Sequence, residues 1–184
     1  IDGEMGDRLL KRRVQKVAKA CDVDLEDGGM NSRFFYRSVA ADQVDLSQPE
    51  GQHALLQHVR AVKHAKRPRY RLKLLVLDSL VSLTGFSDSS KSWNELYTWL
   101  KELRDMGMAV LLVHHANKAG SQRGTALKTA AVDNVLYLSQ EEAKSISDVA
   151  ISVHIEKGRE LYGIAKRPLT IHLNPSSKRP KWRT

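Results

Sequence analysis

Apolar residues recur at three- and four-residue steps in three segments of the chain, a spacing that places them on one face of a helix. The first segment follows Gly3, and its apolar stripe is surrounded by lysine and arginine. The second begins near Pro49, whose fixed φ suits a first helical turn, with Ser47 as its cap. The third opens with a capping-box pattern at Ser92 and stops at Gly107. The pattern therefore predicts three amphipathic helices.

Short apolar runs between and after these helices predict strands. Leu72 to Leu77 and Met108 to Val113 are almost uninterrupted aliphatic, which is typical of strands buried on both faces of a parallel sheet. With the helix between them they form a strand–helix–strand unit whose crossover is long enough for parallel pairing. The aromatic run Phe34 to Val39 predicts a further strand.

Three more strands are predicted toward the C-terminus, at residues 134–138, 149–156 and 169–173. No helix separates them, so we expect them to pair antiparallel at one end of the sheet. The expected fold is therefore α/β, with a mainly parallel sheet flanked by helices and antiparallel strands at the C-terminal edge.

Length and composition limit the classes of protein to consider. The 184 residues fit one domain, which we place at 1–175, followed by a flexible basic tail at 176–184. No apolar run approaches the roughly 20 residues of a membrane helix. The net charge of +9 favours a polyanionic partner such as nucleic acid. The single cysteine excludes an intrachain disulfide and a Cys-rich zinc site, which fits a reducing cytoplasm.

Polar side chains stand where three of the predicted strands end. In an open α/β sheet, ligands bind outside the carboxyl ends of the strands, so we expect these side chains to converge on one site. They are Asp2 and Glu4, Asp78 and Ser79, and His114 and His115.

The residue types at these strand ends are those of a magnesium-nucleotide site. A carboxylate held rigidly after a buried strand, as at Asp78, can orient Mg²⁺ or its water shell. Glu4 could act as a general base on a water that attacks phosphate. Alternatives stay open: Asp78 as a turn former and Glu4 as a first-turn acid that favours the helix dipole. His114 and His115 point to opposite faces of a continued strand, so one faces a ligand and the other packs into the structure.

Residues 85–92 nearly spell the phosphate-binding P-loop pattern G-x-x-x-x-G-K-[ST], between a strand and a helix. The second glycine is replaced by Ser90, although a backbone wrapped around phosphate generally needs the freedom of glycine. The capping box already accounts for Ser92. We therefore do not assign the nucleotide site to this segment, and a phosphate-handling enzyme that uses it is kept as an alternative.

Taken in order, five runs resemble the RecA-like ATPases, and most closely the RepA-type hexameric replicative helicases. These runs are 2–5 (DGEM), 77–80 (LDSL), 113–118 (VHHANK), 122–127 (QRGTAL) and 133–135 (DNV). The resemblance implies ATP and Mg²⁺ as cofactors and a hexamer or filament with ATP at subunit interfaces. It makes Glu4 the catalytic base, Asp78 the Walker B magnesium carboxylate beside Ser79, and one of the pair His114 and His115, with His115 preferred, the γ-phosphate sensor.

Two further regions gain a role from the same resemblance. Lys157 and Arg159 look like the family's Lys-x-Arg pair, which reaches the neighbouring subunit's nucleotide. The planar fork of arginine suits spreading phosphoryl charge, and the alternative is a turn with two solvated cations. The loop from Asn117 to Lys128 corresponds to the channel loop that touches single-stranded DNA in relatives. Its cations Lys118, Arg123 and Lys128 suit tracking of phosphates.

The sequence departs from the family pattern in two places. The Walker A segment should precede the strand that ends at Asp2, so we interpret the chain as a fragment that lacks the phosphate cradle and is inactive by itself. The spacing between Arg123 and Asp133 also differs slightly from the usual pattern. The expected function is an ATP-dependent helicase or translocase core in DNA replication or mobile-element maintenance. The alternative is a non-hydrolysing DNA-binding or regulatory module on the same fold.

Two other basic segments are candidates for contact with single-stranded DNA, each with an aromatic residue that could stack on a base. They are Arg60 to Lys73, which contains Tyr70, and Lys178 to Arg183, which contains Trp182. A solvated loop and a disordered tail are the alternatives.

Overall fold

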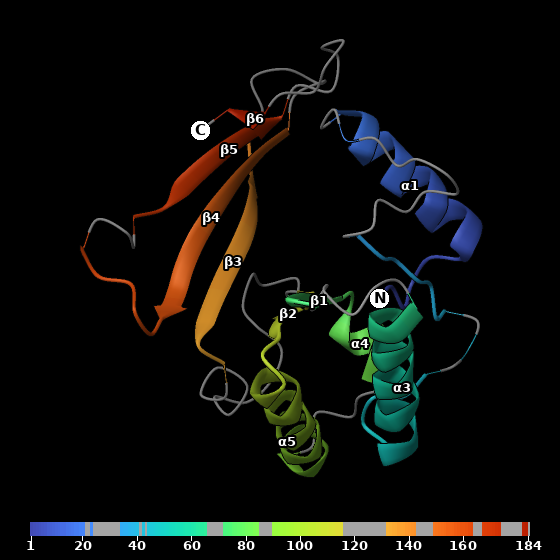
Figure 1. Ribbon diagram of the computed structural model, residues 1–184. Coiled ribbons are helices and arrows are strands. Elements are labelled where there is room, and N and C mark those ends of the chain that lie inside the picture. Colours follow the sequence, from blue (N-terminus) through green and yellow to red (C-terminus); the bar gives the residue numbers. More distant parts are fainter. Residues whose placement is uncertain are drawn as a thin grey trace. The chain divides into compact units, whose positions relative to one another are not determined.

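The computed structural model describes residues 1–20, 23, 34–40, 42, 44–65, 72–84, 90–115, 132–142, 149–163, 167–173 and 182–183. The chain divides into two compact units, one comprising residues 1–15 and 24–124 and the other residues 16–23 and 125–184. The order of helices and strands along the chain can be followed in Figure 1. In the part of the chain that is described, no helix has the length and apolar character needed to cross a membrane.

Four helices are present among the described residues: α1 (Asp7–Ala20), α3 (Pro49–Ala65), α4 (Leu80–Thr84) and α5 (Ser90–Asp105). They confirm the three amphipathic helices, and the short α4 is additional. Helix α5 begins two residues before the expected cap and ends at Asp105, two residues before Gly107, whose φ of 81° is in the left-handed region. Ser47 does not cap α3: among the described residues its hydroxyl accepts from the side chain of Gln48 at 3.3 Å and donates to Asp45 Oδ1 at 2.6 Å, and no backbone N–H of the helix donates to it.

The first unit is built on parallel strand pairing. Strand β1 (Leu74–Leu77) pairs in parallel with β2 (Ala109–Leu112), which confirms the strand–helix–strand unit. Asp2 extends this arrangement, since it forms parallel bridges to Asp78 on one side and to Ser38 on the other. The aromatic run that was expected to be a strand contributes only the bridge at Ser38.

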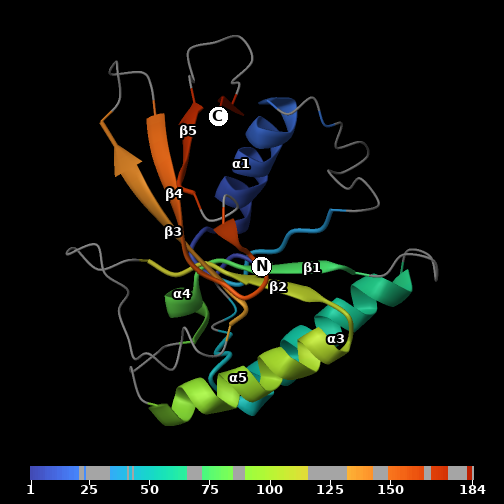
Figure 2. The ribbon, with the colours of Figure 1, turned by 90° about the vertical axis from the view of Figure 1, so that its left-hand side faces the viewer.

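Burial in this unit is one-sided. Leu75 and Leu77 are buried, whereas Leu74 of β1 is 55% exposed and Leu111 of β2 is 47% exposed, so the expectation of strands buried on both faces is wrong. Figures 1 and 2 show α3 and α5 on the same side of β1 and β2. Successive side chains of a strand point to opposite faces, so helices on one side bury only alternate residues.

The second unit contains a four-stranded antiparallel sheet with the order β3-β4-β5-β6. Its strands are β3 (Asn134–Glu141), β4 (Val149–Gly158), β5 (Leu169–Leu173) and β6 (Trp182–Arg183). The three predicted strands and their antiparallel pairing are confirmed.

Among the described residues, these strands form a sheet of their own, whereas we expected them to continue the parallel sheet. Short connections make consecutive strands pair with one another, and the apolar pattern of a strand carries no information about which sheet it joins. Within the expected tail, Trp182 and Arg183 pair with β5.

Candidate active site

The turn that follows Asp2 is shaped by the carboxylate of that residue. Asp2 Oδ1 accepts hydrogen bonds from the backbone N–H of Glu4 at 2.8 Å and of Met5 at 2.7 Å. Asp2 is buried at 5% exposure. Its role is therefore structural: it satisfies two backbone donors and directs Glu4 away from the strand.

Backbone hydrogen bonds fix this turn against the end of β1. The N–H of Gly3 donates to the carbonyl of Asp78 at 2.7 Å, and the N–H of Asp78 donates to the carbonyl of Ile1 at 3.0 Å. A Cβ on Gly3 would lie 2.6 Å from Ser82 Oγ and 2.8 Å from Leu83 Cδ2, so only glycine fits here without a shift. Close contact between the two chain segments thus brings Glu4 beside the residues that follow β1.

Side chains from three strand ends meet at the Glu4 carboxylate. Glu4 Oε1 accepts a hydrogen bond from Ser79 Oγ at 2.5 Å and another from His115 Nε2 at 2.9 Å. Ser79 is fully buried, and its hydroxyl also lies 3.2 Å from Ser82 Oγ. Glu4 and His115 are more exposed, so Ser79 contacts the Glu4 carboxylate from the protein interior and the other side of the site is open to solvent. The structure therefore brings Glu4, Ser79 and His115 together.

These contacts change the acidity of Glu4. The hydrogen bond from Ser79 and then the hydrogen bond from His115 lower the pKa of Glu4, burial opposes them, and the charge of His115 adds the smallest lowering. The carboxylate form is the one that accepts both hydrogen bonds. Glu4 consequently keeps its negative charge to a lower pH than an isolated glutamate.

Asp78 has the opposite shift. Burial raises the pKa of Asp78, and the negative charges of Asp2 and Glu4 raise it further. The carboxylates at these strand ends therefore repel one another, and a bound cation would reduce this repulsion. The described residues contain no cluster of three ligating side chains. One carboxylate is nevertheless enough for Mg²⁺ that keeps most of its waters and also binds phosphate oxygens.

The two adjacent histidines differ in what they contact. His115 Nε2 bonds to Glu4, whereas His114 Nδ1 donates to the backbone carbonyl of His115 at 2.8 Å. His114 is less exposed than its neighbour. His115 therefore faces Glu4, whereas His114 is half-buried and bonds to the neighbouring backbone carbonyl, so it does not pack into the interior as expected.

Lys157 and Arg159 lie in the second unit, near the end of β4, and both bond to the segment that precedes β3. Lys157 Nζ donates to the carbonyl of Val132 at 2.6 Å. Arg159 donates from its backbone N–H to the carbonyl of Asp133 at 3.1 Å and from Nη1 to Asp133 Oδ1 at 2.7 Å. The Arg159 and Asp133 side chains are 61% and 50% exposed. An ion pair this exposed is weak, so Arg159 can leave Asp133 for another anion at low cost.

The sequence assigned no role to Asp133, although it lies within one of the runs that carry the family resemblance. Asp2 was noted only for its place at a strand end, and its buried, turn-forming carboxylate has no sequence signal. The loop residues Lys118, Arg123 and Lys128 lie outside the described residues, as does most of the P-loop-like segment 85–92.

Comparison with known families supports the nucleotide-site interpretation. The family model AAA_25, described as AAA domain, matches residues 1–121, which is most of the chain. The chain belongs to this family. The matched part of this AAA domain contains Glu4, Asp78, Ser79 and both histidines, but neither Lys157 nor Arg159. No curated protein shows a significant match.

Membership establishes the coarser part of the expectation from sequence. The chain is an AAA ATPase domain of the RecA-like P-loop class, and its family binds nucleotide. The α/β fold with a small parallel sheet agrees with this class. The RepA-type branch is a finer assignment than the family match, and we return to it below.

We predict that Ser79→Ala raises the pKa of Glu4 toward the ordinary value, because the hydrogen bond from Ser79 is the largest cause of its lowering. His115→Ala should raise it by less. NMR titration of the Glu4 side-chain carboxyl resonance measures both effects. Ser139→Ala, a substitution of a serine that bonds to Glu141 in the antiparallel sheet, is the control and should leave Glu4 unchanged. A larger shift in the His115 variant than in the Ser79 variant would contradict this assignment.

Proposed function

We propose that this AAA domain is the ATPase core of a RepA-type DNA helicase or translocase that acts in DNA replication or mobile-element maintenance. The observation that carries the proposal is the meeting of Glu4, Ser79 and His115 next to Asp78 at the ends of neighbouring strands. ATP hydrolysis needs a base, a metal carboxylate and a group that senses the γ-phosphate, and these residue types supply all three.

Glu4 serves as the general base in this proposal. It is a carboxylate at neutral pH and can accept a proton from an attacking water, although its lowered pKa makes it a weaker base than an ordinary glutamate. Ser79 holds the carboxylate from the buried side, which fixes the direction from which Glu4 can reach that water. One carboxylate oxygen accepts both hydrogen bonds, so the other is available for the substrate water.

Asp78 serves as the magnesium carboxylate. Burial raises the pKa of Asp78 most, and the negative charges of Asp2 and Glu4 add to it; a divalent cation would offset the repulsion between these acids. Mg²⁺ bound with ATP would supply charge stabilisation to the phosphoryl oxygens. Asp78 is held by backbone hydrogen bonding to Ile1, and this rigidity suits an orienting role.

His115 serves as the γ-phosphate sensor and as the link to DNA. It lies at the carboxyl end of β2 and immediately precedes the segment that contains Lys118 and Arg123. If His115 turned from Glu4 to a bound γ-phosphate, Glu4 would lose one of its two hydrogen bonds. A change in the nucleotide would then reach both the base and the DNA loop through one residue.

In this proposal the protein forms a hexamer or filament, and Arg159 reaches the nucleotide that is bound to the neighbouring subunit. Its pairing with Asp133 holds the guanidinium at the surface, where it can exchange a carboxylate for a phosphate. Lys157 is bound to the same preceding segment, so the two cations are positioned together. Single-stranded DNA is the proposed polymer partner, held by the loop cations Lys118, Arg123 and Lys128.

A non-hydrolysing DNA-binding or regulatory module on the same fold is the second candidate. The printed sequence contains no complete G-x-x-x-x-G-K-[ST] pattern, and this favours the candidate for the chain taken by itself. The hydrogen-bonded base favours the ATPase, because a module that only binds DNA has no use for Glu4 held in this way. Hydrolysis therefore has to be tested in a protein that carries this chain together with a P-loop.

In such a protein, we predict that Glu4→Gln reduces the DNA-stimulated ATPase rate by about 100-fold or more, because the amide cannot accept the proton from water. ATP binding, measured with a fluorescent analogue, should be nearly unchanged. Glu95→Gln, at an exposed position of α5, is the matched control and should retain the rate. If the Glu4 variant hydrolysed ATP at the wild-type rate, Glu4 would not be the general base.

Arg159→Ala should also abolish most hydrolysis and spare nucleotide binding, because an arginine finger acts mainly on transition-state charge. Arg167→Ala is the control. Mixed assemblies of Arg159→Ala and Glu4→Gln subunits should recover part of the activity, since some interfaces combine an intact Glu4 with an intact Arg159. An Arg159 variant that hydrolyses ATP at the wild-type rate would favour the alternative of a turn with solvated cations.

The 184-residue chain should bind single-stranded oligonucleotides weakly, independently of their sequence and less tightly as salt rises, because phosphate contacts release counterions. Fluorescence anisotropy with two unrelated oligonucleotides at two salt concentrations measures this. Replacing Lys118, Arg123 and Lys128 together with glutamine should weaken binding about tenfold and flatten the salt dependence. Strong discrimination between the oligonucleotides, or an affinity that salt does not change, would contradict the prediction.

A further inference from the structure

Helix α1 carries a stripe of positive charge that the ATPase site does not use. Six of its fourteen residues are lysine or arginine, and Asp7 is its only acid. At 3.6 residues per turn, five of the six cations fall within an arc of about 140°. We call these five the basic stripe: Arg8, Lys11, Arg12, Lys16 and Lys19. Arg13 lies outside it. The stripe follows one continuous helix, so the helix itself sets its geometry.

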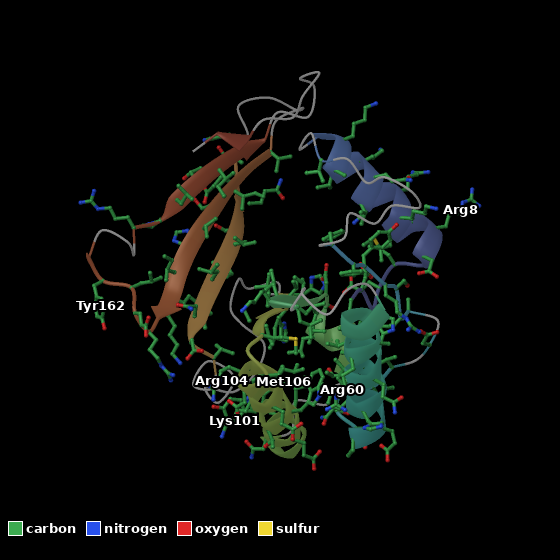
Figure 3. All side chains as sticks on the ribbon, in the orientation of Figure 1. Arg8, Arg60, Lys101, Arg104, Met106 and Tyr162 are labelled. Atoms are coloured by element: carbon green, nitrogen blue, oxygen red, sulfur yellow. The ribbon has the colours of Figure 1, made fainter. Side chains whose placement is uncertain are left out.

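The basic stripe faces solvent. All five side chains are exposed, whereas Leu10 on the other side of the helix and Ala18 at the edge of the stripe are buried at 8% exposure each. Figure 3 shows Arg8 pointing away from α1. Among the residues that the structure describes, no acidic side chain pairs with any of the five cations. The positive charge is therefore not neutralised within the described part of the protein.

A row of unneutralised cations on a rigid helix fits a polyanion with regular charge spacing. The stripe extends about 16 Å from Arg8 to Lys19 at 1.5 Å per residue. Duplex DNA carries one charge per about 1.7 Å of its axis, so this length faces several phosphates. An anionic membrane fits less well, because an interfacial helix inserts a continuous apolar side. On α1, Leu10 and Ala18 are buried, which leaves only Leu9 and Val17, at 45% and 62% exposure, as exposed large apolar residues.

The composition of α1 also distinguishes between forms of DNA. Proteins that bind single strands stack unpaired bases on aromatic side chains, and α1 contains no aromatic residue. The stripe offers cations alone, which suits a backbone whose bases are paired and hidden. We propose that the basic stripe of α1 binds the phosphate backbone of duplex DNA, as a contact separate from the proposed single-strand loop.

The experiment measures the 184-residue chain without nucleotide, so its result does not depend on ATP hydrolysis or on the loop assignment. Fluorescence anisotropy compares a 20-base-pair duplex with one of its single strands at 50 and 150 mM salt. The test variant is Arg8→Gln/Arg12→Gln/Lys19→Gln. The control variant, Lys101→Gln/Arg104→Gln/Arg167→Gln, removes the same charge at other exposed positions, of which Figure 3 labels Lys101 and Arg104. Circular dichroism checks that both variants keep their helices.

In the test variant, duplex affinity at 50 mM salt should fall about tenfold, and the slope of log affinity against log salt should become shallower by about 2 to 3. The control variant should lose less than threefold, and single-strand affinity should change less than threefold in both. An equal loss of duplex affinity in the two variants would overturn the inference, because net charge alone would then explain it. An equal loss for single strand and duplex in the test variant would overturn the duplex assignment.

Discussion

The candidate site depends on the two rows of backbone hydrogen bonds that flank Asp2. On one side Asp2 pairs with the segment around Ser38, and on the other the residues beside it pair with Asp78. These bonds bring together residues about 75 positions apart in the sequence. Without them, Glu4 would leave Ser79 and His115, and the carboxyl ends of the strands would no longer form one site. The positions of the site residues therefore depend on this parallel pairing.

Charge at the site follows from the same constraint. Three acidic residues lie near the two strand ends, and the protein treats them differently. Asp2 is buried and satisfied by backbone N–H groups, Glu4 is held charged by two side-chain donors, and Asp78 is left with a raised pKa. Placing carboxylates this close has an electrostatic cost, which is lowest when a cation is bound. A bound cation would therefore stabilise this arrangement of acids.

Much of this arrangement could be predicted from sequence because it rests on local patterns. Apolar periodicity identified α1, α3 and α5, and the aliphatic runs identified β1 and β2. The rule that ligands bind at the carboxyl ends of parallel strands brought Glu4, Asp78 and His115 into one hypothesis. The separate antiparallel sheet, the one-sided burial of β1 and the bond from Ser47 to Asp45 were not predicted, because each depends on a partner far away or on a side-chain competitor that periodicity does not encode.

Gly3 stands between two of the acids and has no chemistry of its own. A Cβ there would press on Ser82 Oγ, the atom that also accepts from the N–H of Ser79 and lies against its hydroxyl. Steric pressure at residue 3 would therefore be transmitted through two serines to the carboxylate of Glu4. A methyl group added at this position should therefore disturb the placement of Glu4, so a residue without any reactive group would matter to the site.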